Sequence, residues 1–421
     1  MLGRVSVGRS WQLGLVAVIA AVSISACGAS GGSSSSAGSG GSVAIAMNTS
    51  LSGPFASIGL SNQNGVHFAV DQINASGGLL GKTINLEVKD DSTKPDVATE
   101  LARNEILNDH IVMLVGGVSS SAALAEQTVI AKYKIPFIAQ TSNTDALTVT
   151  KFNDYTFSVV TNTGMEGRAN AIAAAKLPAT KYYLLAPDYE FGHSQVKAFK
   201  AQLQKLRPDV QFVGEDYPKL GATDFSTYLN KVQAAHPDMV YSAQFGGDLI
   251  TLLTQAKAAG VVGGAESPKF MGLFDVDTLR NLGGSAPAGA YAYSRAPYFA
   301  INTSVMTKFV SDFKAKYNVA PSDWAVNAYD AVTLWAAGVR KANSFDGTAV
   351  SNAMSGLTFD AVRGSLTVRT IDHQVACPEY EGTLAPDSNA GFDTFAATAV
   401  AVPGDQIILT PDEVTAARSA A

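Results

Sequence analysis

Three consecutive serines follow an apolar segment at the start of a predicted helix. The apolar run ends with two glycines in VGGVSSSAALAEQ (115–127), and Ser119, Ser120 and Ser121 come next. A helix N-terminus presents unpaired backbone N–H groups and about half a positive charge. An anion held there gains those donors, and a serine hydroxyl adds another. The pattern indicates a carboxylate site at Ser120 and Ser121, or equally simple N-capping, for which one serine is enough.

A second polar cluster follows another apolar run. The segment IPFIAQTSNTDALT (135–148) passes from apolar residues to Thr141, Ser142 and Asn143. In open α/β sheets, ligands bind at the carboxyl ends of the strands. We therefore expect this cluster to close around the same ligand as the serines. The alternative is a turn, in which Asn and Ser are common anyway.

Aromatic residues mark three strand ends in the second half of the chain. They are Tyr189 and Phe191 in PDYEFGHS, Phe245 in SAQFGG and Phe274 in GLFDVD. A single aromatic residue at such a position more often packs in a core. Aromatic residues at three strand ends exceed what a core requires, so we expect an aromatic wall facing the polar clusters.

The serines do not form a hydrolase motif. In GGVSSS, Ser121 stands where a G-x-S-x-G nucleophile elbow needs its last glycine. The five histidines show no metal-binding spacing. No complete phosphate-binding loop is present. A serine hydrolase is therefore a remote alternative, and no cofactor or metal is expected.

The N-terminus has the layout of a secretory signal. Two arginines precede the apolar run LGLVAVIAAV (13–22), which is too short for a permanent membrane-spanning helix. The run leads into ISAC, which resembles the lipobox of bacterial lipoproteins. This resemblance implies a signal peptide over residues 1–26 and lipidation of Cys27. A soluble secreted protein is the alternative.

The residues after Cys27 are almost all Gly, Ser and Ala, a composition that behaves as a random coil. We expect residues 27–42 to be a tether that anchors a globular region to the membrane without spanning it. The whole chain has a net charge of −6, and without the leader it has 28 basic and 36 acidic residues, a net charge of −8. A mildly acidic surface argues against a nucleic-acid partner. Cys377 has no partner for an intradomain disulfide and is expected to be a small buried hydrophobic residue.

About 380 residues remain after the leader, which predicts two domains. Residues 83–91 alternate apolar and polar side chains as a strand does, and residues 94–109 show helical spacing after an initial Lys-Pro. A strand (111–117), a helix (120–134) and a strand (135–140) follow. This βαβαβ order indicates a parallel sheet with right-handed crossovers.

After a polar link over residues 151–164 the α/β pattern begins again. Strands are expected over 181–188, 210–217, 238–245 and 269–274. Helices are expected to begin near Gly192, Asp224 and Asp248, with the two aspartates as N-caps. Long helices over 304–317 and 322–342 would return to the first domain, and strands over 364–372 and 392–402 would end the chain.

Motifs throughout the mature chain resemble those of the branched-chain amino-acid-binding proteins, the type I periplasmic solute receptors of ABC importers. They lie between about residues 43 and 380, and they are SLSGPFASIG, AVDQINASGGLLGKTINLEVKDD, GGVSSSAALA, IPFIAQTSNTDALT, DYEFG, FMG and RAPYF. Each motif alone has low specificity for the family, but the order and spacing of all of them are specific.

The resemblance implies an α/β fold with two Rossmann-like lobes, three hinge crossovers and a ligand in the cleft between them. The expected parts are a first lobe over 43–162 and 295–363, a second lobe over 165–293 and 366–405, and a tail over 406–421. The resemblance also implies that Ser120 and the Thr141–Asn143 segment bind the carboxylate of the ligand. A monomer that delivers its ligand to membrane permease subunits is expected, and a sensor that feeds a signalling partner is the alternative.

The sequence departs from the family pattern where an ammonium would bind. Phe274 stands at the position where these receptors place an acid, and Asp275 comes next, on the opposite face of a strand. Phe191 and Phe245 replace tyrosines, and Ile58 stands where an aromatic residue is common. Either Asp275 reaches the ligand, or the ligand lacks an ammonium. An apolar or aromatic carboxylate, or an amide, would then fit better than leucine.

Overall fold

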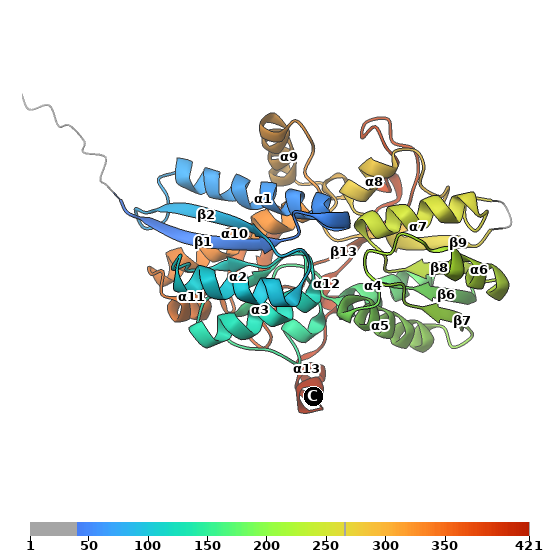
Figure 1. The fold of residues 1–421 in the computed structure, drawn as a ribbon, viewed down its shortest axis with the longest axis horizontal. Helices are drawn as coiled ribbons and strands as arrows, with labels where there is room; N and C mark the ends of the chain where they lie inside the picture. Colours follow the sequence, from blue (N-terminus) through green and yellow to red (C-terminus); the bar gives the residue numbers. More distant parts are fainter. Residues whose placement is uncertain (1–39, 265–266, 421) are drawn as a thin grey trace, which may run out of the picture. The chain divides into compact units, whose positions relative to one another are not determined.

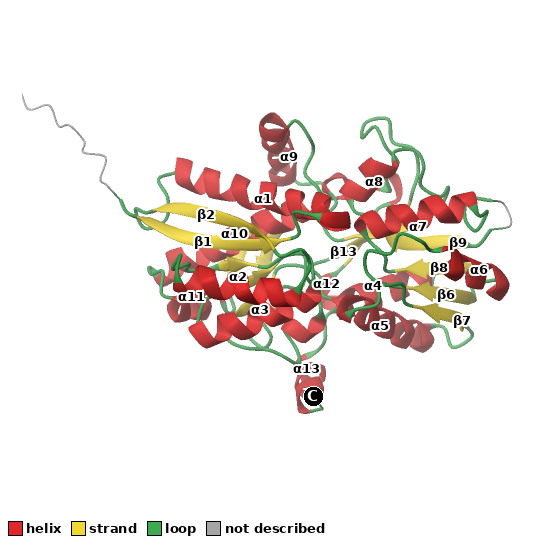
Figure 2. Cartoon of the chain, in the orientation of Figure 1, coloured by secondary structure: helices red, strands yellow, loops and turns green. Residues whose placement is uncertain are grey.

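The computed structural model describes residues 40–264 and 267–420. The expected signal peptide, Cys27 and most of the tether lie outside this part of the chain. Two large sheets with flanking helices make up the described region (Figures 1 and 2). No helix within it combines the length and the apolar character that a membrane span requires.

The first sheet is entirely parallel and has the strand order β2-β1-β3-β4-β5. Its strands are β1 (Ser42–Thr49), β2 (Thr83–Asp90), β3 (Leu114–Val115), β4 (Phe137–Ala139) and β5 (Thr156–Ser158). The predicted βαβαβ order is confirmed. Strand β5 was not predicted and lies inside the segment that we expected to be a polar link. It could not be detected, because its single apolar residue, Phe157, gives no alternation of apolar and polar side chains.

Helices cover both faces of the first sheet, and strand β1 shows why. Val43, Ile45 and Met47 pack with helices α1 (Ala56–Ala75), α10 (Asp323–Ala342) and α11 (Gly347–Met354). Ala46 faces the other way, toward α2 (Pro95–Leu107) and α3 (Ser120–Tyr133). Alternate residues of a strand point to opposite faces, so one strand contributes to two cores. Helix α10 lies against α1, which confirms the predicted return to the first lobe.

The second sheet has seven strands in the order β14-β13-β10-β9-β8-β6-β7. They are β6 (Lys181–Leu185), β7 (Gln211–Asp216), β8 (Met239–Ser242), β9 (Lys269–Leu273), β10 (Tyr291–Ser294), β13 (Glu379–Thr383) and β14 (Val400–Val402). The first five pair in parallel, and β13 and β14 pair antiparallel at one edge.

The second sheet is also covered on both faces. Tyr182 and Leu184 of β6 pack with helices α4 (Thr163–Ala174) and α5 (Glu190–Leu206). Tyr183 and Leu185 of the same strand face α6 (Ser226–Ala235), α7 (Gly246–Ala258) and α8 (Val276–Leu282). Each lobe is thus a layer of helices, a sheet and a second layer of helices, as predicted for an α/β chain.

Neither aspartate predicted as an N-cap in the second lobe is one. The N-cap of α6 is Phe225, although Asp224, one residue earlier, accepts a hydrogen bond from the Ser226 amide at 2.9 Å. Asp248 is not an N-cap, because α7 already begins at Gly246. Its carboxylate instead accepts a hydrogen bond from the Gly221 amide at 2.8 Å.

The chain leaves the first lobe for the last time later than the predicted boundary at 363–366. Strands β11 (Thr358–Ala361) and β12 (Gly364–Thr367) form a hairpin whose Leu366 packs in the core of the first lobe. Gln374 pairs in parallel with Ser158, and Cys377 is buried in the same core. The third crossing therefore lies between Cys377 and β13, and the prediction of Cys377 as a buried hydrophobic residue is confirmed.

The segment predicted as a C-terminal tail contains two helices, α12 (Gly404–Ile407) and α13 (Pro411–Ser419). Helix α12 packs on α4 of the second lobe, where Arg168 donates to the Ile407 carbonyl at 2.8 Å. Arg418 of α13 donates instead to first-lobe carbonyls, those of Ile371 at 2.8 Å and Val149 at 3.0 Å. The last residues therefore bridge the two lobes.

Candidate ligand-binding cleft

The serines before α3 divide two tasks between them. Ser119 is the N-cap, and its hydroxyl oxygen accepts the Ala122 amide at 3.3 Å. Ser120 is the first residue of the helix, is 1% exposed, and accepts a long hydrogen bond from the Asn143 amide at 3.4 Å. The capping interpretation is confirmed for Ser119. Ser120 is left at a helix N-terminus without a capping role.

Free donors gather at this corner of the first lobe. Among the described residues, the backbone amides of Ser120, Ser121 and Thr141 have no hydrogen-bond acceptor. The buried Ser142 hydroxyl is likewise unpaired within the same residues. Buried donors are normally paired, so a cluster of free ones calls for an acceptor. The positive end of the α3 dipole adds to their attraction for an anion.

Asn143 joins these donors to the hinge. Its side-chain amide donates to the Thr161 carbonyl and to the Glu166 carboxylate, each at 3.0 Å. Thr161 lies on the first crossing, and Glu166 lies on α4 of the second lobe. The polar corner is therefore fixed from both sides of the crossing.

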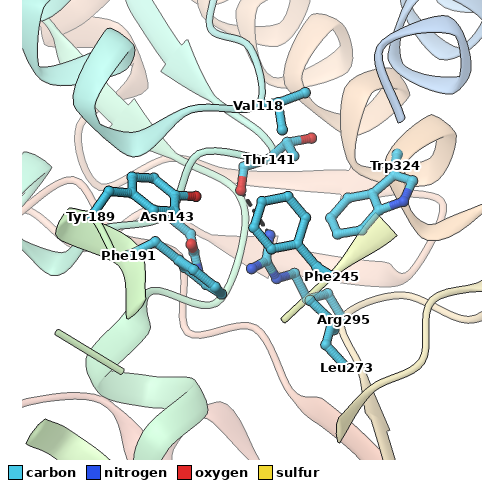
Figure 3. A pocket seen from close by; sticks show the side chains of 9 residues that line it. All are labelled: Val118, Thr141, Asn143, Tyr189, Phe191, Phe245, Leu273, Arg295 and Trp324. Atoms are coloured by element: carbon cyan, nitrogen blue, oxygen red, sulfur yellow. Dashed lines mark hydrogen bonds between the residues drawn. The ribbon is translucent and has the colours of Figure 1, made fainter. Parts of the chain in front are cut away.

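Aromatic and aliphatic side chains of the second lobe face the polar corner (Figure 3). Phe245, just before α7, stands edge-on to Phe191 with the ring centres 5.4 Å apart, and it stacks on Phe55 of the first lobe at 4.9 Å. Tyr189 and Leu273 complete this wall. Burial raises the pKa of Tyr189, so its phenol stays protonated and can donate a hydrogen bond.

The two walls enclose a hollow whose free space is about 10 Å³. The residues that line it are Val118, Thr141, Asn143, Tyr189, Phe191, Phe245, Leu273, Arg295 and Trp324. This free space is far below the roughly 300–1,000 Å³ of sites for drug-sized ligands. The side chains stand so close together that the free space within is near that of one water molecule. A solute would enter only after the walls move apart.

Arg295 is the one charged residue among the nine that line the hollow. It follows β10 on the second crossing, and its side chain is 3% exposed. The guanidinium pairs with Glu166 and donates to the Thr141 carbonyl at 2.7 Å (Figure 3). Burial is the largest influence and alone would lower the pKa of Arg295, but the charge and hydrogen bond of Glu166, together with the nearby Glu379 and Tyr293, raise the pKa overall.

The expected site residues fall into two groups. Thr141, Asn143, Tyr189, Phe191 and Phe245 line the hollow. The others do not. Ser120 contacts Asn143 from outside the lining, and Ser121 and Ser142 are not among the lining residues. Ile58 packs in the same apolar cluster as Phe245, and Phe274 and Asp275 face elsewhere.

The structure corrects the expectation for Phe274. Phe270 of β9 and Phe274, the residue just after this strand, face α7 and α8, and Phe274 is fully buried there. Leu273 points to the opposite face and lines the hollow. Side chains alternate along a strand, so only one of two neighbours can face the cleft.

Asp275 does not reach the hollow either. It is the N-cap of α8, and its carboxylate accepts the amides of Asp277 and Thr278 at 3.0 and 3.1 Å. It also accepts the Trp324 indole N–H at 2.9 Å, so it lies behind a lining residue. Asp275 therefore positions Trp324 and leaves no acid facing the ligand space.

Sequence reasoning missed four of the lining residues as site residues: Val118, Leu273, Arg295 and Trp324. Arg295 stood in a recognised motif, RAPYF, and a single arginine beside a strand end was a usable signal. Trp324 comes from α10, in sequence far from the strand ends that the cleft argument considered. No local pattern connects it to the site.

Polar contacts join the two lobes around the hollow. Thr144 donates to Glu190 of α5 at 2.7 Å, and Ser194 of the same helix donates to Asp145 at 3.1 Å. Ser61 of α1 donates to Asp277 of α8. The structure thus shows the walls of the cleft in contact, which is the closed arrangement of a two-lobed receptor.

No group of three or more His, Cys, Asp or Glu side chains within residues 40–264 and 267–420 is placed to hold a metal ion. The cleft offers hydrogen-bond donors, one cation and aromatic faces. This arrangement can bind a small solute, and it contains no pairing of nucleophile and base.

Comparisons with known proteins agree with this geometry. The family model of the periplasmic binding proteins matches residues 42–384. The Leu/Ile/Val-binding protein BraC3 of Rhizobium johnstonii is 27% identical over 325 residues, which cover 74% of this chain and 83% of that protein. A periplasmic binding protein from Burkholderia mallei has a similar fold, with a TM-score of 0.81, 24% identity, and coverage of 88% of this chain and 97% of that one.

A third similar protein is a solute-binding protein of an ABC transporter from R. palustris, solved in complex with benzoate. Its TM-score is 0.75 at 23% identity, over 86% of this chain and 98% of that one. The fold, the resemblance noted in the sequence and the family match point the same way. The chain belongs to the periplasmic binding protein family, in the type I group that includes the Leu/Ile/Val-binding proteins, which is a family of binding proteins and not of enzymes.

Proposed function

We propose that this protein is an extracytoplasmic, lipid-anchored receptor of an ABC importer that binds a small carboxylate between its lobes. One observation carries the proposal: the hollow has Thr141, whose backbone amide is free among the described residues, and an arginine on one side, aromatic faces on the other, and no acid among its lining residues. The donors suit a carboxylate head group, and the aromatic wall suits an apolar body.

The head group is proposed to bind at the start of α3. The free amides of Ser120, Ser121 and Thr141 and the Ser142 hydroxyl would then find an acceptor. Hydrogen bonds to a charged group are each worth about 1.5–3 kcal/mol. Ser120 would act both through its hydroxyl and by holding the Asn143 amide.

The binding cycle is proposed to be hinge opening and closing. The free space in the hollow is near that of one water, so the ligand must enter while the lobes are apart. The contacts Thr144–Glu190 and Ser194–Asp145 would re-form on closure. A ligand shifts this equilibrium only by binding the closed state more tightly than the open one.

The partners are proposed from the leader and the relatives. The lipobox-like ISAC segment and the Gly/Ser stretch after Cys27 fit a receptor tethered near membrane permease subunits. The R. palustris protein with a similar fold is a solute-binding protein of an ABC transporter.

Replacing Cys27 with Ser is expected to move the protein from the membrane fraction to the soluble fraction, because the lipid would no longer be attached. Continued retention of the variant in the membrane fraction would contradict the anchor.

The carboxylate site is tested by a thermal-shift screen followed by calorimetric titration. The screen includes leucine, isoleucine, phenylalanine, benzoate, 4-hydroxybenzoate and benzamide. A ligand at 100 times its Kd stabilises the folded state by about 2.7 kcal/mol and raises Tm. Carboxylates are expected to raise Tm and benzamide is not. A screen in which no carboxylate binds would contradict the proposed function.

A further inference from the structure

Arg295 occupies the point at which the two lobes and the hollow meet. It belongs to the second crossing, between β10 and the short η3 helix (Tyr298–Ala300), and it lines the hollow beside Thr141 (Figure 3). Its partners come from two different regions, Glu166 on α4 and Thr141 after β4. A charge at this position acts on any solute that the lobes enclose.

The guanidinium has unused donor capacity. It carries five N–H bonds. Within the described residues, Nε and Nη2 each donate to the Glu166 carboxylate, the latter at 3.3 Å, and Nη1 donates to the Thr141 carbonyl at 2.7 Å. One N–H on each terminal nitrogen is left over. Two neighbouring N–H groups match the two oxygens of a carboxylate.

Arg295 is also held rigidly. Its guanidinium carbon lies 5.2 Å from the ring centre of Trp324 and 5.9 Å from that of Phe191, within the range of cation–π attraction. Glu166 is fully buried and is fixed in turn by the Asn143 amide at 3.0 Å. The arginine is thus pre-organised, and ligand binding would not have to order it.

The acids near the hollow are already engaged. Glu166 binds Arg295 and Asn143, and Asp275 binds the start of α8 and Trp324. Glu379 accepts the Thr161 hydroxyl at 2.8 Å, and burial followed by the Glu166 charge raises its pKa. None of these carboxyl groups lines the hollow. An ammonium enclosed there would be desolvated without a counter-ion, which costs several kcal/mol.

We infer that Arg295 is the selectivity determinant of this cleft, admitting carboxylates without an ammonium group and discriminating against amino acids of the same carbon skeleton. The inference rests on the proposed function and goes beyond it, because it assigns the choice between anion and zwitterion to one residue. The preferred class is a monocarboxylate with a flat or compact apolar body.

The test compares ligands that differ only in the ammonium group. Calorimetric titrations of the full mature chain use 3-phenylpropanoate against L-phenylalanine, and 4-methylpentanoate against L-leucine. The native protein is expected to bind each acid at least about tenfold more tightly than its amino acid, which corresponds to about 1.4 kcal/mol. Equal affinities, or a preference for the amino acids, would overturn the inference while leaving carboxylate binding intact.

Variants assign the selectivity to the residue. Arg295→Gln leaves the buried Glu166 carboxylate without its counter-charge and can fail to fold, so the decisive variant is the neutral pair Arg295→Gln/Glu166→Gln. Its ratio of acid to amino-acid affinity is expected to fall below about threefold. Arg295→Lys, which keeps the charge, is expected to retain a preference for the acids.

If Arg295 had only a structural role, its replacement would weaken the binding of both ligands of a pair equally and leave the ratio of acid to amino-acid affinity unchanged. An unchanged ratio in a folded double variant would overturn the inference. Circular dichroism and Tm confirm folding. If none of the four probes binds the native protein, the proposed function fails and this inference fails with it. If the amino acids bind and the acids do not, only this inference fails.

Discussion

The two walls of the cleft are built from opposite chemistry. The first-lobe wall consists of backbone amides, hydroxyls and an amide side chain around Thr141 and Asn143, at a helix N-terminus. The second-lobe wall presents Phe191, Phe245 and Leu273. A polar wall recognises a head group through directed hydrogen bonds, whereas an aromatic wall accepts apolar bodies of several shapes. Head-group chemistry is therefore expected to be strict, and body shape more tolerant.

The largest expected effect comes from placing a glutamate at either of two neighbouring positions at the end of β9, Leu273 and Phe274. Phe274→Glu places a carboxylate in the core between the sheet and helices α7 and α8, and it is expected to cost about 3–5 kcal/mol of unfolding free energy. Leu273→Glu points into the hollow beside Arg295 and is expected to cost less and to favour amino acids. Denaturant titration compares the two. Equal losses of stability would contradict the assignment of Phe274 to the core and of Leu273 to the hollow.

The polar wall is tested by two adjacent serines. Ser120→Ala is expected to weaken binding of the tightest carboxylate by about 1.5–3 kcal/mol, roughly 10- to 150-fold in Kd. Ser119→Ala removes only the N-cap, so it is expected to cost about 1 kcal/mol of stability and to leave affinity unchanged. Calorimetry and thermal unfolding separate the two outcomes. A Ser119 variant that binds as weakly as the Ser120 variant would contradict this division of roles.

The polar wall also has buried carboxyl groups behind it. Helix α3 carries Glu126, and Asn48 donates to both Glu126 and Glu105 at 2.9 and 3.1 Å. Burial raises the pKa of Glu105 to about 7 from its ordinary value near 4.5. As pH rises, the unfolded chain loses this proton first, so stability is full below about pH 4.5 and declines as pH rises to about 7.

Glu105→Gln is expected to flatten this decline by on the order of 1–3 kcal/mol. The exposed Glu100, on the same helix α2, supplies the control, because Glu100→Gln is expected to leave the slope unchanged. Denaturant titrations at pH 5 and pH 8 measure the difference. An identical slope in the Glu105 variant and the native protein would show that this carboxyl ionises normally in the fold.

The smallest effect is expected on the aromatic wall. Phe245→Leu removes the stacking with Phe55 and the edge contact with Phe191, and it is expected to weaken aromatic carboxylates by about 0.5–1.5 kcal/mol. Aliphatic carboxylates are expected to lose less. Phe274→Leu is the matched control, since it alters stability without touching the hollow. An equal loss for aromatic and aliphatic ligands would indicate that the wall is not selective.

Much of the fold was predictable because local patterns determine it. Residues 83–90 alternate in period two, and Pro95 opens a helix of regular spacing, and both elements formed as predicted. Strand β5 escaped prediction because three residues are too few to show a period. The C-terminal α13 also escaped, although Thr410 and Glu413 form a capping box that is readable in the sequence TPDE.

The site was less predictable because its residues meet only through the tertiary fold. Thr141 and Asn143 were found because strand ends of a parallel sheet share one edge. The facing of Phe274 depends on the register of β9 in its sheet, which no local pattern fixes. Arg295 and Glu166 are 129 positions apart, so their pairing could not be read from spacing.

The C-terminal segment, α12 and α13, forms a fourth connection between the lobes in addition to the three crossings. It begins on α4 and finishes with Arg418 fixed to first-lobe carbonyls and lying 4.2 Å from the ring centre of Phe152. This segment lies beyond residue 384, where the match to the family model ends. If one lobe rotates away from the other, the C-terminal segment must either move with one lobe or lose its contacts at one end, those of Arg168 with Ile407 or those of Arg418 with the first lobe. This rotation would thus have a built-in stop, set by residues outside the common receptor framework.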